Sequence, residues 1–292
     1  MSILTRSALT LMLLALMPPA LSAETFSYQP QIAQAGYDYL PDDELRSIQV
    51  GAQSSPVLVR SWEGRHQYGA VILLASPGQV PDTPGLIAHL RRALNSAGWA
   101  SINLSSPLPL PRANFSTTAE SVANPGEGQL KLTSGQSTPD YSMTQMSEFI
   151  SQRQASVSEA LGQLDVLGSE FPGKRLMIVS NQTAAMVIEL LNQEKIPTPD
   201  LLVVFNPYLP QPQLNAALIS GLEKLSIPVL DIQSPDGHPA SRETLTKRQH
   251  LSRSKGPAKY RQLQLALDLD IPSAWQDATV AIKGFAYTSL IR

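Results

Sequence analysis

The stretch RLMIVSNQTAAMVIELL, residues 175–191, decides the fold. Its first half holds a short apolar and partly β-branched run, Leu176–Val179, which predicts a strand. Its second half predicts an apolar helix over Gln182–Asn192, and a tight turn with small residues joins the two. A strand, a sharp turn and a helix in this order form the setting of a nucleophile elbow, whose motif is G-x-S-x-G.

The five positions of that motif read Ser180-Asn181-Gln182-Thr183-Ala184 in this chain. The outer residues are small, which allows the strand and the helix to approach closely, although neither is glycine. The middle position, where the nucleophile is expected, holds Gln182. An amide is neither a nucleophile nor an acid or base at neutral pH. The stretch therefore predicts a fold and the location of a site, but no reaction.

Apolar strand-like runs alternate with helical patterns on both sides of this stretch. Strands are predicted at Leu45–Val50, Pro56–Trp62, Tyr68–Ala75, Trp99–Leu104, Leu176–Val179, Leu201–Phe205, Pro228–Ile232 and Tyr260–Leu267. Helices are predicted at Gly85–Ala97, Thr144–Leu167, Gln182–Asn192, Gln213–Leu225, Ser241–Ser252 and Pro272–Ile291. This alternation predicts an α/β fold in which a mostly parallel sheet is covered on both faces, as a three-layer sandwich. In the first helix, Arg91 and Asn95 are expected to point away from the apolar face.

The N-terminal segment, residues 1–23, has the pattern of a secretory signal peptide. Arg6 precedes an apolar run, Ala8–Met17, and small residues follow, so cleavage is expected after Ser22 or Ala23. That run is shorter than the roughly 20 residues that a spanning helix needs. The chain has no cysteine, so it forms no disulfide. We expect export to a bacterial periplasm, no membrane-spanning segment, and one domain over residues 24–292.

Composition limits the classes of partner. The chain has 292 residues, 42% of them hydrophobic, and a net charge of −2, which suits one large α/β domain and argues against general nucleic-acid binding. Residues 108–141 are polar and lack an apolar period, so they are either a surface excursion or a lid-like insertion. A basic run contains Arg242, Lys247, Arg248 and Arg253, and is either a solvated helix face or a surface for anionic envelope components.

Several stretches together resemble a known family. They are LLASPGQVPDTPGLIAHLRRALNSAGWASINLSSPLP (residues 73–109), PVLDI (228–232) with YRQLQL (260–265), and AWQDATVAIKGFA (274–286). They resemble an uncharacterised family of bacterial exported proteins, a domain of unknown function in the α/β-hydrolase superfamily. The resemblance covers roughly residues 30–292. It implies an α/β-hydrolase-like fold and carries no established activity.

Acyl transfer in such a fold needs a nucleophile, an acid after the penultimate strand and a base after the last strand. Asp236 stands at the acid position, but no histidine follows the last predicted strand. His238 is the one histidine expected at the correct edge of the sheet, and it also has the bland interpretation of an ordinary loop histidine. Ser180 and Thr183 are the candidate hydroxyls, and both are equally explained as cap or turn residues.

The loop Ser76–Asp82 occupies the place of an oxyanion loop. Gly78 and Gln79 in this loop, together with Gln182, are the candidate binding residues for an anion or a carbonyl. Pro77 and Pro81 lack N–H groups, which reduces the number of donors. No histidine pair has metal-ligand spacing, and no phosphate-binding or dinucleotide-binding glycine motif occurs. The sequence therefore predicts neither a metal nor a cofactor.

Two hypotheses follow. The first is an exported protein of α/β-hydrolase fold without serine-hydrolase activity, which binds a small molecule or an envelope component in the vestigial cleft. The second is a divergent esterase or amidase that uses Thr183 or Ser180 with His238 and Asp236. The glutamine at the elbow and the missing base favour the first hypothesis, and the likeness of fold alone favours the second.

Overall fold

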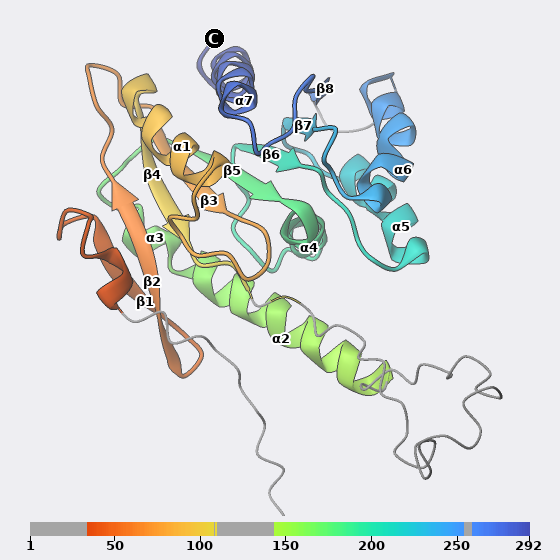
Figure 1. Ribbon diagram of the computed structural model, residues 1–292, viewed down its shortest axis with the longest axis horizontal. Helices are drawn as coiled ribbons and strands as arrows, with labels where there is room; N and C mark the ends of the chain where they lie inside the picture. Colours follow the sequence, from red (N-terminus) through yellow and green to blue (C-terminus); the bar gives the residue numbers. More distant parts are fainter. Residues whose placement is uncertain (1–33, 108, 110–142, 254–258) are drawn as a thin grey trace, which may run out of the picture. The chain divides into compact units, whose positions relative to one another are not determined.

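An eight-stranded sheet forms the centre of the structure (Figure 1). The computed structural model describes residues 34–107, 109, 143–253 and 259–292. The strands are β1 (Leu45–Val50), β2 (Gln53–Arg60), β3 (Gly69–Leu74), β4 (Trp99–Leu104), β5 (Lys174–Ser180), β6 (Leu201–Phe205), β7 (Val229–Gln233) and β8 (Tyr260–Gln264). They lie in the order β1-β2-β4-β3-β5-β6-β7-β8. Strand β2 runs antiparallel to both β1 and β4, and the other neighbouring pairs are parallel.

Helices cover both faces of this sheet (Figure 1). They are α1 (Leu86–Ala93), α2 (Met143–Gly162), α3 (Leu164–Leu167), α4 (Asn181–Asn192), α5 (Pro212–Glu223), α6 (Pro239–Gln249) and α7 (Pro272–Ala286). Short helical turns lie at Gln34–Tyr37, Asn95–Ala97, His250–Arg253 and Tyr287–Ile291. Apolar side chains of α1 and α7 share one core cluster, and those of α2 to α5 share the other. The expected three-layer α/β arrangement is confirmed.

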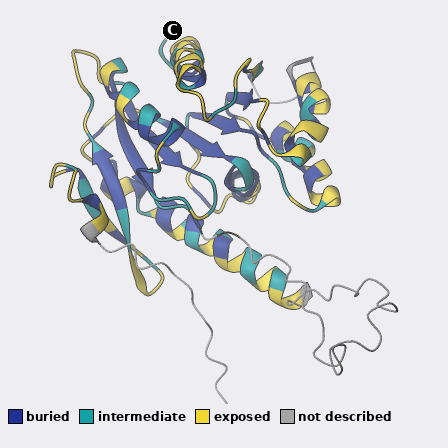
Figure 2. Ribbon diagram, in the orientation of Figure 1, coloured by how far each residue is buried: buried dark blue, intermediate teal, exposed yellow. Residues whose placement is uncertain are grey.

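Strands β3, β4 and β6 are buried along their whole length (Figure 2). Continuous apolar runs such as LLVVF of β6 suit a strand covered on both faces. The predicted bounds of β1, β4 and β6 are confirmed, whereas β8 ends at Gln264 rather than Leu267. The predicted helices Gly85–Ala97 and Thr144–Leu167 are each divided into two shorter helices. Because the strands are parallel, the loops after β3, β5, β6, β7 and β8 meet at their carboxyl edge.

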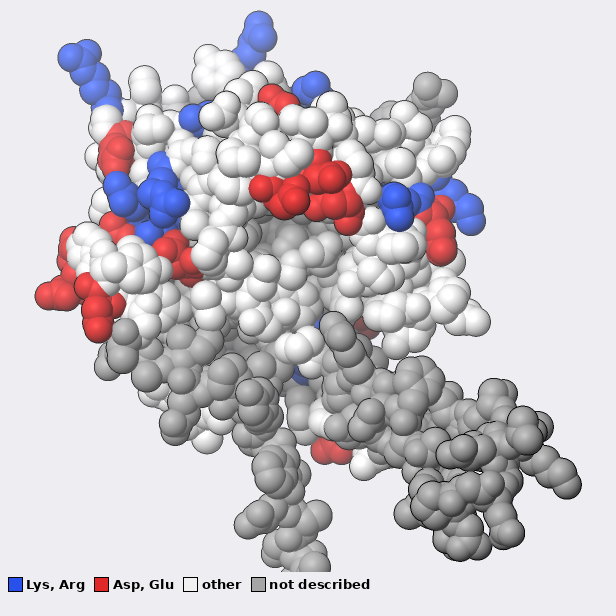
Figure 3. All heavy atoms as spheres, in the orientation of Figure 1, with Lys and Arg blue, Asp and Glu red and all other residues white. Residues whose placement is uncertain are grey.

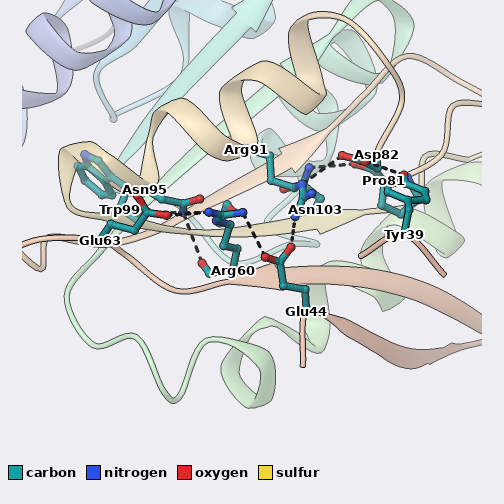
Figure 4. A network of polar contacts seen from close by, with 11 residues as sticks. Tyr39, Glu44, Arg60, Glu63, Pro81, Asp82, Arg91, Asn95, Trp99 and Asn103 are labelled. Carbon is teal, nitrogen blue, oxygen red and sulfur yellow. Dashed lines mark hydrogen bonds and ion pairs between the residues drawn. The ribbon is translucent and has the colours of Figure 1, made fainter. Parts of the chain in front are cut away.

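A buried ion-pair network fixes the loop that follows β3 (Figure 4). Arg91 of α1, which was expected to face away from the core, is 1% exposed and pairs with both Glu44 and Asp82. The hydroxyl of Tyr39 donates to the other oxygen of Asp82 at 2.7 Å. Asn95 was also expected outside and is fully buried, where it donates to the carbonyl of Trp99 at 2.9 Å. Both expectations were wrong because the residues' partners lie in other elements.

Some predictions concern parts of the chain that the structure leaves undescribed. The signal peptide at 1–23 and the insertion at 108–141, Pro109 excepted, lie outside the described residues. Within the described ranges, no helix combines the length and the apolar character that crossing a membrane requires.

Candidate functional site at the carboxyl edge of the sheet

The turn between β5 and α4 has the geometry of an elbow, but its strained residue is Asn181. Ser180 is extended, with φ −131° and ψ 152°, and α4 begins with the next residue. Asn181 has φ 53°, in the left-handed region that residues other than glycine seldom adopt. The middle position of the elbow is thus the half-buried Asn181, one residue before the expected Gln182. This correction leaves an amide where the motif requires a nucleophile.

Three polar side chains meet directly at this turn. The Nδ2 group of Asn181 donates to Oγ of Ser76 at 2.6 Å. The hydroxyls of Ser76 and Ser180 are 3.2 Å apart. Ser76 follows β3, the strand beside β5, so the sheet order brings these residues together. The hydroxyl of Ser180 therefore faces the hydroxyl of Ser76, which in turn accepts the hydrogen bond from Asn181. Among the described residues, no base is hydrogen-bonded to Oγ of Ser180.

The loop after β3, which was expected to act as an oxyanion loop, uses its N–H groups for hydrogen bonds within the protein. The N–H of Ser76 donates to Oε1 of Gln79 at 2.9 Å, and the N–H of Gln79 donates to the carbonyl of Ser76 at 3.1 Å. The N–H of Gly78 donates to the carbonyl of Pro107 at 2.7 Å. Gly78 and Gln79, predicted to hold an anion or carbonyl, thus lie at the edge of the sheet with their N–H groups already engaged.

Thr183, the other candidate nucleophile, lies in the first turn of α4. Its side chain is fully buried, and its Oγ1 has no hydrogen-bond partner among the described residues. A nucleophile needs access to substrate and a base in hydrogen-bond reach. This placement gives Thr183 neither.

A second set of contacts joins the predicted residues Gln182 and His238 through Tyr208. The Nε2 group of Gln182 donates to the Tyr208 hydroxyl at 3.2 Å. The rings of Tyr208 and His238 are stacked, with centroids 4.0 Å apart and planes 3° apart. His238 caps α6, because its Nδ1 accepts the N–H of Ala240 at 3.2 Å. This bond places the imidazole proton of neutral His238 on Nε2.

The loop after β7 holds the acid position. Asp236 is exposed, and no hydrogen bond joins it to His238 although both residues are described. At the start of this loop, the side chain of Asn206, whose φ is 46°, accepts a hydrogen bond from the N–H of Ser234 at 2.9 Å and donates one to its Oγ at 2.7 Å. The four residues proposed for the divergent enzyme, Ser180, Thr183, Asp236 and His238, are therefore not linked to one another by hydrogen bonds.

The base position after β8 contains no histidine in the described structure. The loop between β8 and α7 runs over residues 265–271, where the carbonyl of Leu269 accepts the indole N–H of Trp275 at 2.6 Å. His89 of α1 is partly buried against α7, the helix that follows this loop. Its Nε2 lies 3.2 Å from Oγ1 of Thr279. Burial, and then the charge of Arg92, lower the pKa of His89 below its ordinary value.

One predicted surface residue is in fact interior. Arg248 is 0% exposed and pairs with Asp231 of β7, so it cannot belong to an anion-binding surface. Asp231 also accepts hydrogen bonds from the Tyr260 hydroxyl at 2.5 Å and from Gln262 at 3.0 Å. Arg242 and Lys247 are exposed as predicted, and Figure 3 shows basic side chains beside an acidic one where α6 lies. The side chain of Arg253 is outside the described part.

Within the described residues, no group of three or more histidine, aspartate or glutamate side chains has the arrangement of a metal site. The side chains that meet at the carboxyl edge are amides, hydroxyls, one phenol and one imidazole, and the carboxylate of Asp236 is exposed in the loop after β7. This set suits hydrogen bonding to a ligand, and it places no activated nucleophile beside a base.

Comparison with models of protein families shows which family the chain belongs to. The model described as "Protein of unknown function (DUF3530)" matches residues 17–288. The chain belongs to this family. The DUF3530 match spans nearly the whole sequence, in agreement with the resemblance to an uncharacterised family within the α/β-hydrolase superfamily. A search of curated proteins found no match.

Solved structures similar to this DUF3530 chain share its fold at low sequence identity. Est1E from Butyrivibrio proteoclasticus has 10% identity and a TM-score of 0.54, with 84% of this chain and 98% of that chain covered. An alpha-beta serine hydrolase homologue from Coxiella burnetii has 12% identity and a TM-score of 0.53, with 84% and 98% covered. Dienelactone hydrolase from Anabaena variabilis has 14% identity and a TM-score of 0.53, with 84% and 97% covered. The fold is that of the α/β hydrolases.

Sequence reasoning missed three residues of this site: Ser76, Asn181 and Tyr208. Asn181 carried a usable signal, because asparagine is among the residues that best tolerate a left-handed backbone at a sharp turn. Ser76 follows a predicted buried strand and was included only as the first residue of a loop. Tyr208 lies in a proline-rich loop after β6, where no pattern distinguishes it.

Proposed function

We propose that this DUF3530 protein is an exported α/β-hydrolase-fold protein without serine-hydrolase activity, which binds a small molecule or an envelope component at the carboxyl edge of its sheet. The observation that carries the proposal is the elbow. Its strained position holds Asn181, whose amide donates to Ser76. An amide cannot form the covalent acyl intermediate that the fold's usual chemistry requires.

Two further observations support the loss of acyl-transfer chemistry. The N–H groups of the loop after β3 bond within the loop and to Pro107, whereas an oxyanion hole needs donors aimed at the developing charge. The chain from Leu265 to Ile271 also carries no histidine. Nucleophile and base act as a unit, and the oxyanion donors supply much of the acceleration that remains without them, so the absence of all three features removes most of the rate acceleration.

The rival function is a divergent esterase or amidase with Ser180 or Thr183 as nucleophile and His238 with Asp236 as base and acid. A kinetic experiment separates the two. The wild-type protein is assayed with p-nitrophenyl acetate and butyrate beside Ser180→Ala, Thr183→Val and His238→Ala. We expect the wild type to hydrolyse both esters no faster than the variants do. Saturable hydrolysis that falls at least about a hundredfold in one hydroxyl variant and in His238→Ala would establish the rival function.

Export belongs to the same proposal, and it is supported by the signal-peptide pattern of residues 1–23. Expression of the full chain in a Gram-negative host, followed by osmotic shock and N-terminal sequencing, tests it. We expect protein in the periplasmic fraction that begins at residue 23 or 24. Protein that retains Met1 in the cytoplasmic or inner-membrane fraction would contradict export.

A further inference from the structure

Arg153 of α2 occupies a core-facing position of an otherwise apolar helix face. Val157 and Leu161, four and eight residues further on, are 2% and 0% exposed and belong to the core. Arg153 itself is 8% exposed. Two of its guanidinium nitrogens, Nε and Nη2, are buried and have no hydrogen-bond partner among the described residues.

Other buried arginines of this protein have carboxylates. Arg91 pairs with Glu44 and Asp82, and Arg248 pairs with Asp231. A buried guanidinium without an anion is costly, because it gives up hydration and receives no Coulomb compensation. The contrast marks Arg153 as a cation kept for something other than the stability of the core.

The positions of the two unpaired nitrogens of Arg153 determine which kind of ligand group they can bind. Nε and Nη2 lie on the same edge of the guanidinium, where two N–H groups point in parallel. That edge matches two oxygens of a carboxylate or a phosphate, which bind it in bidentate fashion. Burial lowers the pKa of Arg153 to about 10, so the group remains a cation at neutral pH.

The position of Arg153 connects it to the candidate site. Helix α2 packs against α4, whose first turn carries Gln182, and the phenol of Tyr208 is close enough to Arg153 to raise the pKa of its guanidinium. The Tyr208 oxygen accepts a hydrogen bond from Gln182, which leaves the phenolic hydrogen available for donation to a ligand. Gln182 belongs to the first turn of α4, a helix of 12 residues whose N-terminus carries partial positive charge.

We propose that Arg153 is the anchor of an anion site, in which the carboxylate or phosphate group of a small ligand binds its Nε and Nη2 and receives a further hydrogen bond from Tyr208. This inference rests on the proposed function and gives its ligand a chemical class. The site is assembled by α2, by the loop after β6 and by the N-terminus of α4.

Thermal unfolding of the dialysed mature protein in graded sodium phosphate or sodium acetate, with sodium chloride holding the ionic strength constant, tests this site. We expect a saturable rise in the melting temperature with phosphate or with acetate, and the arm that responds identifies the anion. Arg153→Met should abolish the rise. Arg153→Lys keeps the positive charge but lacks the two parallel N–H donors of the guanidinium, and it should weaken binding about tenfold. Tyr208→Phe should weaken it less, and Arg92→Met, at an exposed position of α1, is the matched control that should leave it unchanged.

An equal rise in wild type and Arg153→Met, or no rise with either anion, would overturn the anion site. The melting temperatures of the variants without added anion show that they are folded, and Arg153→Lys decides the question if Arg153→Met fails to fold. The experiments distinguish failure of the proposed function from failure of the anion site. Ester hydrolysis that depends on Ser180 or Thr183 would refute the proposed function without removing an Arg153-dependent anion response, whereas loss of that response alone would refute only the ligand class.

Discussion

Replacing arginine by methionine at two buried positions is expected to change stability in opposite directions. Arg248 and Arg153 are 0% and 8% exposed. Arg248 faces Asp231, which is also fully buried, whereas Nε and Nη2 of Arg153 have no partner among the described residues. Methionine retains much of the apolar length of arginine and removes its charge, so the pair of variants isolates the effect of a paired against an unpaired cation.

The magnitudes follow from the surroundings of each group. Arg248→Met leaves the carboxylate of Asp231 buried without a counter-charge, which costs about 3–5 kcal/mol. Arg153→Met removes a cation whose burial lowers its pKa from 12.5 to about 10. At about 1.4 kcal/mol per pKa unit, removal of this charge should raise the free energy of unfolding at pH 7 by about 3 kcal/mol when no binding anion is present.

Urea unfolding at pH 7 in sodium chloride, followed by tryptophan fluorescence, measures both effects. Arg242→Met, at an exposed position, should change the free energy of unfolding by less than about 0.5 kcal/mol. The reasoning would be refuted if Arg153→Met destabilised the protein as strongly as Arg248→Met does. That result would mean that Arg153 has an anionic partner within the chain itself.

Three further perturbations test other parts of the structure. Asn181→Ala and Asn181→Gly both lose the bond to Ser76, but glycine relieves the positive φ, so in urea unfolding Asn181→Gly should be the more stable by about 1 kcal/mol. Burial and Asp231 raise the pKa of Tyr260 above its ordinary 10.0, so the folded state keeps this proton while the unfolded state loses it. The stability that results is complete below pH 10 and declines above it, and Tyr260→Phe should flatten this decline in unfolding midpoints measured from pH 9 to 12. Gly237→Ala places a Cβ against the buried side-chain amides of Gln233 and Asn206 and should lower the melting temperature, whereas Gly162→Ala meets nothing within 4 Å and should not.

The sequence was sufficient for the sheet and for the place of the site. Continuous apolar runs such as Leu201–Phe205 predict strands buried on both faces, and the match of β1, β4 and β6 to their predicted bounds shows how strong this signal is. The loops at the carboxyl edge follow from a parallel sheet, so the region of Ser180, Gln182 and His238 could be located before any geometry was known.

The register of the elbow could not be fixed in the same way. Small residues at Ser180 and Ala184 matched the outer positions of the motif, but what defines the elbow is the backbone angle of one residue. That residue is Asn181, and its left-handed conformation depends on the packing of β5 against α4 rather than on composition.

Buried charges were the other source of error. Arg91 and Arg248 have the hydropathy of surface residues. Their carboxylate partners include Glu44, 47 positions from Arg91, and Asp231, 17 positions from Arg248. A single sequence does not reveal which distant carboxylate will face which arginine. Arg153 carried a local signal, since it interrupts a helix stripe that continues with Val157 and Leu161.

Intact-mass spectrometry after exposure to a fluorophosphonate probe tests the central claim most directly, because the probe forms a covalent bond with an activated serine or threonine hydroxyl. We expect no adduct on the wild-type protein. We also expect little on Asn181→Ser, since the new hydroxyl would stand at the strained position without a histidine after β8 to take its proton. A stoichiometric adduct on wild-type Ser180 or Thr183 that disappears in His238→Ala would contradict the account.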